Sequence, residues 1–274
     1  MRGAPNADPP LTPPLTATHL IRSCSPSLRL SLPALFRATA DNRLNSAVST
    51  LSKGPVAPSD KIGRSDAELI LKSCAADGKL LQGDRPAMTL DSLHAERAFG
   101  RTSPAADEIW ATSTELDGST FTVVLGATLA KDRAVAYGAD LGLPAGTAFV
   151  AYEANASSKV ILGSSLQLSA CGKWDFQLWA IAPILGNGWA LLGEPSKWVP
   201  VSAARFSALS YVTQGSDTSA SVVATGQVGE QIDVAWLAPG SSEPTVVKCT
   251  IPGGSKVRVQ VTTATSGAVC LDVP

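Results

Sequence analysis

The larger, C-terminal part of the chain is a series of short apolar segments separated by turn-forming residues. From residue 107 onward, apolar and β-branched runs alternate with Gly, Pro, Asp and Asn, which is the pattern of strands joined by tight turns. Asp117 and Gly118, directly before a long apolar run, predict a hairpin. Trp174–Ile181 alternates apolar side chains on one face, as a half-buried strand does. We therefore expect an antiparallel β-sandwich over 107–274.

The residues before this region have a different character. Paired prolines in 1–18 exclude helix and sheet and predict a disordered or extended tail. In 19–106, a cap at Asp41 or Asn42 and apolar residues on one face predict a helix that ends near Leu51. A second helix is expected over 67–76, with Ser65 or Asp66 as its cap, and Ser65 and Glu68 have the spacing of a capping box. The region 19–106 therefore predicts short α/β elements followed by a connector.

The order of short sequence motifs around these helices resembles the order found in one protein family. It is similar to the segment that joins the catalytic barrel to the C-terminal β-sandwich in the raffinose synthase and alkaline α-galactosidase group of glycoside hydrolases. There a helix is followed by a Gly-Gly-Pro strand, Ser-Asp-Lys-Pro-Gly, a Leu-Leu helix, an Asp-Gly turn and Arg-Pro. The matching residues here are Ala47 to Leu51, Gly54, Pro55 and Val56, Ser59, Asp60 and Lys61, Gly63, Leu69 to Leu71, Asp77 and Gly78, and Arg85 and Pro86.

A second stretch carries the same resemblance. Residues 176–184, FQLWAIAPI, are similar to the family's strand that ends in Ser-Pro-Val or Ala-Pro-Ile, and LLG at 191–193 and WVP at 198–200 follow as its next strand and bulge. The chain also departs from the family. Ile62 stands where the family often has proline, and Arg85 and Pro86 are followed by Ala-Met-Thr where Thr-Arg-Asp is usual.

The resemblance implies a fold that is mainly β, with a C-terminal antiparallel β-sandwich preceded by a short α/β remnant of a TIM-type barrel. Such a barrel needs about 250 residues, and far fewer precede the end of the corner at Ala76. The family's two catalytic carboxylates lie in motifs with no match here. The resemblance therefore implies a C-terminal fragment without catalytic residues of its own, whose full-length relatives act on α-galactosides.

Two groups of residues are candidates for contact with a sugar. By the resemblance, Ser59, Asp60 and Lys61 lie at the rim of the last barrel strand, where Asp60 either faces substrate or is a turn carboxylate. Trp179 and Trp198 either stack on sugar rings or fill the core. An exposed tryptophan surface would favour the alternative function, a non-catalytic carbohydrate-binding β-sandwich. A third hypothesis is that the chain is a structural or interaction protein.

Composition argues against several other classes of function. The net charge is -1 and charged residues make up 16% of the chain, so we expect neither a nucleic-acid partner nor a membrane partner. Five cysteines without a CxxC pair and two distant histidines predict no metal, no cofactor and no Ser-His-Asp triad.

Two possible modifications remain open in the sequence. Cys249 and Cys270 fall in two predicted C-terminal strands and are either a disulfide or free buried thiols. Asn155 begins an Asn-X-Ser sequon, which matters only in a secreted chain. No signal-peptide core is visible, which predicts a cytoplasmic protein if Met1 is the native start; the localisation is otherwise open.

The predicted N-terminal helices lack the barrel neighbours that the family would supply. They carry six large aliphatic side chains whose burial would contribute on the order of 10 kcal/mol in total, namely Leu44, Val48, Leu51, Leu69, Ile70 and Leu71. We therefore expect the chain to associate with itself through this face, or to leave 42–76 partly unfolded.

Overall fold

The computed structural model describes residues 42–57, 65–100, 107–153, 160–264 and 267–273. Strands dominate, and every strand pair in this part of the chain is antiparallel. The expected mainly β, antiparallel fold is therefore confirmed. The predicted tail 1–18 lies outside the described residues. None of the helices in the described ranges is both long and apolar enough to cross a membrane.

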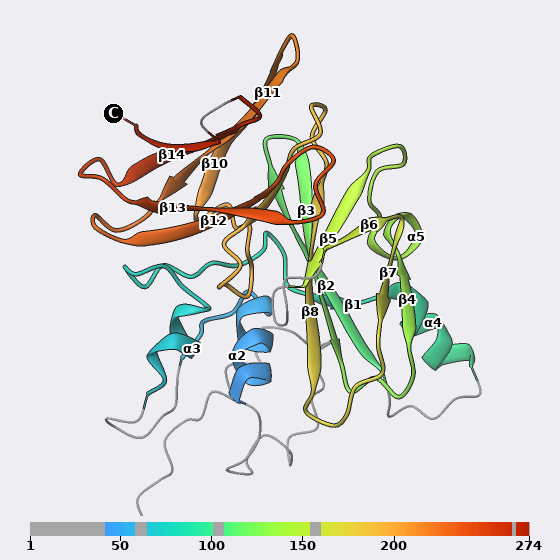
Figure 1. The fold of residues 1–274 in the computed structure, drawn as a ribbon. Helices are drawn as coiled ribbons and strands as arrows, with labels where there is room; N and C mark the ends of the chain where they lie inside the picture. Colours follow the sequence, from blue (N-terminus) through green and yellow to red (C-terminus); the bar gives the residue numbers. More distant parts are fainter. Residues whose placement is uncertain (1–41, 58–64, 101–106, 154–159, 265–266, 274) are drawn as a thin grey trace, which may run out of the picture.

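The central element is a six-stranded sheet with the order β1-β2-β3-β8-β5-β6, drawn in green and yellow in Figure 1. Its strands are β1 (Met88–Thr89), β2 (Glu108–Leu116), β3 (Ser119–Ala127), β5 (Phe149–Glu153), β6 (Val160–Gly163) and β8 (Phe176–Pro183). The predicted hairpin at Asp117 and Gly118 joins β2 to β3. Both turn residues have positive φ, 48° and 77°, as the turn of a two-residue hairpin requires.

One face of this sheet is covered by short elements that follow or precede its strands. They are α4 (Asp91–Phe99), the hairpin of β4 (Arg133–Ala136) with β7 (Ser165–Leu168), and α5 (Tyr137–Leu141). Their apolar side chains pack on Ile109, Val124 and Trp179 of the sheet. The sequence patterns do not predict β4 or α5, because both are short and depend on contacts with the sheet.

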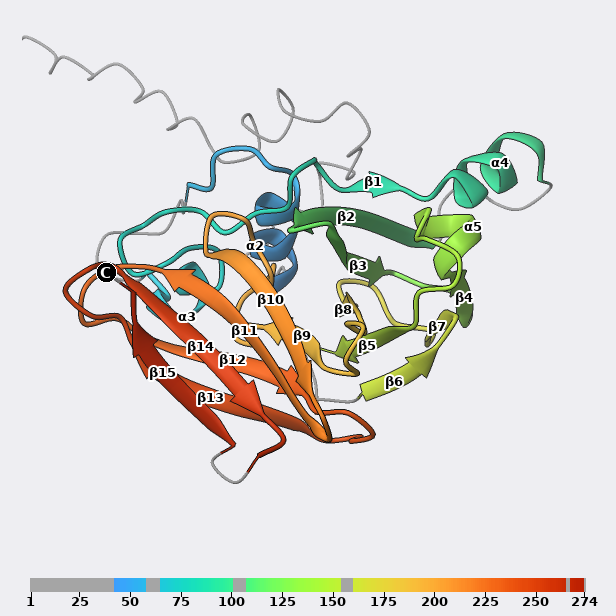
Figure 2. The ribbon, with the colours of Figure 1, turned by 90° about the horizontal axis from the view of Figure 1, so that it is seen from above.

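The opposite face packs against one helix and the C-terminal strands. The helix α2 (Asn42–Leu51) covers one part of it, and Figures 1 and 2 show this helix beside the green strands. Leu44, Val48 and Leu51 are each 5% exposed or less and form one cluster with Leu125 and Leu178 of the sheet. The expectation that this helix would present an unburied face is therefore wrong: the six-stranded sheet covers it.

The second predicted helix is shorter than expected. α3 spans Ala67–Leu71, because the chain turns after it and Cys74 makes an isolated bridge to Leu80. Of the two expected caps, the structure has Asp66, whose Oδ1 accepts from the backbone N–H of Leu69 at 3.0 Å. Leu71 remains 45% exposed, so this part of the expected apolar face stays accessible.

The C-terminal strands form a two-sheet sandwich (red and orange in Figure 2). One sheet has the order β10-β11-β14-β15 and the other β13-β12-β9. Their bounds are β9 (Ala190–Gly193), β10 (Phe206–Gln214), β11 (Asp217–Thr225), β12 (Gln231–Leu237), β13 (Pro244–Thr250), β14 (Lys256–Thr262) and β15 (Ala268–Asp272). Val222, Val259 and Trp236 meet between the sheets, and the same core extends to Phe121 and Val150 of the six-stranded sheet.

The edges of the two sandwich sheets are joined covalently. Cys249 on β13 and Cys270 on β15 form a disulfide across a sequence separation of 21 residues. Of the two alternatives left open by the sequence, the structure has the disulfide. The bond closes the sandwich at the edge where β13 and β15 meet.

We expect Cys270→Ser to lower the free energy of unfolding by about 3 kcal/mol, because a loop of this length loses much conformational entropy when it is closed in the unfolded chain. Urea unfolding at neutral pH measures the difference. A reducing agent should destabilise the wild-type chain by a similar amount and leave Cys270→Ser unchanged. Equal stability of the variant and the oxidised wild type would contradict this role.

Candidate functional site

Four of the residues singled out by the sequence cannot be placed. Ser59, Asp60, Lys61 and the sequon residue Asn155 lie outside the described residues. Their roles stay predictions.

Trp179 and Trp198 do not form a sugar-stacking surface. They are 3% and 2% exposed, and they lie on opposite faces of the six-stranded sheet in two separate apolar clusters. Trp189 is buried as well. The proposed stacking role is therefore wrong for these tryptophans, because their rings are already covered by protein; the alternative, that they fill the core, agrees with the structure.

Trp198 holds the N-terminal segment instead. Its backbone N–H donates to the carbonyl of Lys72 at 2.9 Å, and its indole N–H donates to the Ser46 hydroxyl at 2.9 Å. The Lys72 ammonium lies 5.1 Å from the centre of the Trp198 ring, within the range of a cation–π interaction. One side chain thus connects α2, the end of α3 and the loop after β9.

Next to Trp198, the chain is bent by a glycine that fixes the position of an acidic residue. Gly193 ends β9 with φ +76°, and a Cβ atom there would lie 2.1 Å from the carbonyl oxygen of Pro200. A larger residue would therefore force the loop away from the strand. The bend places Glu194, only 3% exposed, against the start of β10.

A buried arginine faces this glutamate. Arg205 has a side chain only 1% exposed, and its Nε donates to Glu194 Oε2 at 2.7 Å. Its Nη1 and Nη2 donate to the two carboxylate oxygens of Glu230 at 3.1 and 2.5 Å, and Nη1 also donates to the carbonyl of Thr225. The planar guanidinium thus spans two acids from separate loops, a geometry that lysine cannot reproduce.

The two glutamates differ in what else they bind. Glu230 also accepts from the backbone N–H groups of Ala76 and Gln227, both at 3.1 Å, so each of its oxygens accepts two hydrogen bonds. Burial opposes its ionisation, but the hydrogen bonds and charge of Arg205 outweigh this effect and lower the pKa of Glu230. For Glu194 burial is the larger effect and raises the pKa in spite of Arg205.

A polar cavity of about 440 Å³ lies beside Glu194. Its floor is the outer face of β12 and β13, and the loop that contains Ser196 and Lys197 forms its side. The Lys197 ammonium donates to the carbonyls of Leu71 and Cys74 at 2.7 and 2.8 Å, which ties this loop to the segment after α3. The cavity is therefore bounded by strands and by an anchored loop.

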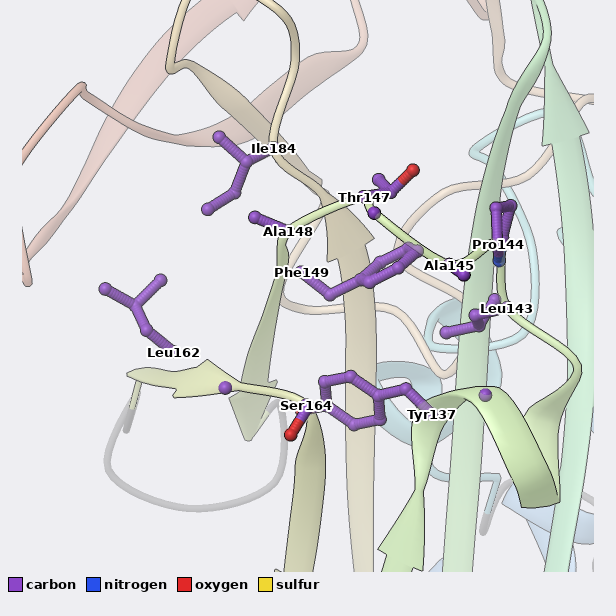
Figure 3. A pocket seen from close by; sticks show the side chains of 13 residues that line it. Tyr137, Leu143, Pro144, Ala145, Thr147, Ala148, Phe149, Leu162, Ser164 and Ile184 are labelled. Carbon is purple, nitrogen blue, oxygen red and sulfur yellow. The ribbon is translucent and has the colours of Figure 1, made fainter.

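A second cavity, of about 550 Å³, lies between α5, the segment 143–149 and the junction of β6 and β7 (Figure 3). Its lining is largely apolar and includes Leu143, Phe149, Leu162 and Ile184, and none of the described residues that line it is charged. The hydroxyl of Tyr137 is buried there without a partner, and burial raises its pKa. The described lining of this cavity thus contains no Asp, Glu, His, Lys or Arg side chain.

The charged cluster is structural and does not form a glycosidase pair. Hydrolysis of a glycosidic bond needs one carboxylate on each side of that bond, whereas Glu194 and Glu230 both bind the same guanidinium. In the described ranges, no cluster of three or more His, Cys, Asp or Glu side chains has the arrangement of a metal site. The polar cavity next to Glu194 is lined by charged and polar side chains of the described residues.

Few features of the sequence indicate this cluster. Arg205 begins a predicted strand in a chain with few charges, and Glu194 follows an apolar run. Neither observation shows that the two residues meet Glu230 in the interior, because the three come from separate turns of the sandwich.

Comparison with known proteins does not place the chain in a family. No family model matches the sequence, and no curated protein is similar enough to match it.

We expect Glu230→Gln to lower the free energy of unfolding by about 1.5–3 kcal/mol at pH 7, as for a hydrogen bond to a charged group. Because the folded pKa of Glu230 is lowered, its ionisation stabilises the fold above the unfolded pKa of about 4.3, and the stabilisation is lost as the pH falls through the folded value. The deficit of the variant should therefore be largest above about pH 5 and shrink below about pH 4.

Urea unfolding of wild type and variant between pH 3 and pH 7 measures this deficit. The charge of Glu230 also raises the pKa of Glu194, so the difference between the two proteins reports the two glutamates on Arg205 together. The exposed Glu243 is a matched control, and Glu243→Gln should change little at any pH. A deficit for Glu230→Gln that stays constant or grows on acidification would contradict the assignment.

Proposed function

We propose that this chain is the non-catalytic C-terminal part of a glycoside-hydrolase-like protein of the α-galactosidase and raffinose synthase type. Its role would be to fix the end of the catalytic barrel against a β-rich domain. The proposal rests on the sequence resemblance in 42–91 and 175–200, and on how these two stretches meet in the fold.

The observation that carries the proposal is the contact between the two resembling stretches. The first stretch supplies the carbonyl of Lys72 and the hydroxyl of Ser46, and the second supplies Trp198, which binds both. The first stretch also donates the N–H of Ala76 to Glu230 and receives the hydroxyl of Ser202 at the carbonyl of Gln82, at 2.8 Å. Such contacts support a corner held in place by the domain that follows it.

This arrangement also supports a role for the residues between the two anchored parts. Ser59, Asp60 and Lys61 follow 54–57 and precede α3 in the sequence. In a full-length relative, a corner fixed at both ends would present Asp60 at the rim of the last barrel strand, where such barrels place their active sites. The present α/β elements would then be the remnant of that barrel.

The proposal favours a supporting role over hydrolysis by this chain. The expected carbohydrate-binding alternative depended on exposed tryptophans, and these are buried. The described carboxylates that are most deeply buried near one another, Glu194 and Glu230, are held by Arg205. This pair is thus not arranged as nucleophile and acid.

We expect the chain to release no nitrophenol from nitrophenyl α-galactoside above the rate without protein, since a retaining enzyme needs two carboxylates about 5 Å apart. Asp60→Ala and Asp233→Asn serve as matched variants, because any true activity should fall in at least one of them. Release that disappears in either variant would contradict the proposal.

The proposal also predicts the origin of the gene. Genomic DNA upstream of Met1 should encode βα units of a barrel in the same reading frame. Upstream sequence with no barrel-like segment would favour an independent module.

A further inference from the structure

The polar cavity beside Glu194 carries an inference of its own. Two cross-strand pairs form its floor: Gln231 faces Thr250, and Asp233 faces Lys248. All four side chains are exposed on the outer face of the sheet and line the cavity. Facing residues lie about 5 Å apart and next-but-one residues along a strand about 7 Å apart, so the four groups lie within reach of one small molecule.

The side chains of the floor are not paired with other described residues. No hydrogen bond or ion pair joins Asp233 to Lys248 in the part of the chain that the structure describes, and the side chains of Gln231 and Thr250 likewise make no hydrogen bond there. The floor therefore presents both donors and acceptors to whatever occupies the cavity.

Glu194 forms part of the wall of the cavity. The residue is 3% exposed, and Oε2 is held by Arg205. The second oxygen, Oε1, has no partner among the described residues, yet it is not one of the fully enclosed unpartnered atoms. Glu194 also lines the cavity, so Oε1 is the oxygen that is left for a ligand there. A carboxylate held by a buried arginine is oriented before any ligand arrives.

The charges around the cavity indicate what kind of molecule fits. Glu194 and Asp233 are balanced by Lys197 and Lys248, so the lining attracts neither an anion nor a cation as a whole. Hydroxyl groups both donate and accept, and a molecule with several of them can satisfy the carboxylates, the amide of Gln231, the hydroxyl of Thr250 and the ammonium of Lys248 together.

We propose that this cavity binds a small neutral polyhydroxylated molecule, a sugar or a polyol, whose hydroxyls donate to Glu194 and Asp233 and accept from Lys248 and Gln231. The tryptophans take no part. The proposal rests on the cavity itself and does not depend on the chain's relation to a hydrolase, so it stands or falls separately from the proposed function.

Saturation-transfer NMR on the full chain tests it with methyl α-galactoside, methyl α-glucoside, myo-inositol and glycerol as separate probes. Binding of at least one of them is expected, and the responding probe distinguishes a sugar from a simple polyol. The per-O-methylated form of a responding glycoside is the matched negative probe, since it cannot donate hydrogen bonds, and its signal should fall at least fivefold.

Two variants on one strand localise the site. Thr250→Trp fills the cavity and should abolish the signal, whereas Val246→Trp, at an exposed position of the same strand that does not line the cavity, should leave it unchanged. Asp233→Asn should weaken binding at least fivefold without loss of fold. The proposal is overturned if no probe binds, if Thr250→Trp binds as well as wild type, or if lysine or inorganic phosphate binds more tightly than every neutral probe.

Discussion

The positive charge of Arg205 is the constraint around which this structure is arranged. A buried guanidinium without partners would be strongly unfavourable, so the loops that supply Glu194 and Glu230 must meet it. Glu230 in turn accepts the N–H of Ala76, which brings in the N-terminal segment. A buried ion cluster of this kind adds little net stability compared with apolar residues, but breaking it is costly. Its effect is therefore to specify which segments come together.

The apolar core also brings separate segments of the chain together. The six-stranded sheet is covered on one face by its own short connections and on the other by α2 and the C-terminal sandwich. In a barrel, α2 would pack on neighbouring βα units; here Leu44, Val48 and Leu51 pack on β3 and β8. The segment is thus part of the β-rich fold, and of the two helices α2 and α3 it is α3 that keeps an exposed large apolar side chain, Leu71.

Local features of this fold could be read from the sequence, while contacts between distant segments could not. The Asp117 and Gly118 turn and most C-terminal strands follow from backbone preference and alternation. Whether Trp198 would stack on a sugar or hold the N-terminal segment depends on Ser46 and Lys72, which are far away in the chain. For the same reason, the sequence leaves two alternatives for Cys249 and Cys270, a disulfide or free buried thiols. The polar cavity needs the register of β12 with β13 and the bend at Gly193, and neither has a local signal.

If the N-terminal segment and the β-sheets form one cooperative unit, native-state hydrogen exchange will detect it. We expect the amides of Val48 and Leu51 in α2 to exchange with nearly the same free energy of opening as those of Val222 and Val259 in the sandwich core. Added urea should lower all four values together, because they open in one global unfolding event. Fast exchange of α2 while the sandwich amides stay protected would contradict the account.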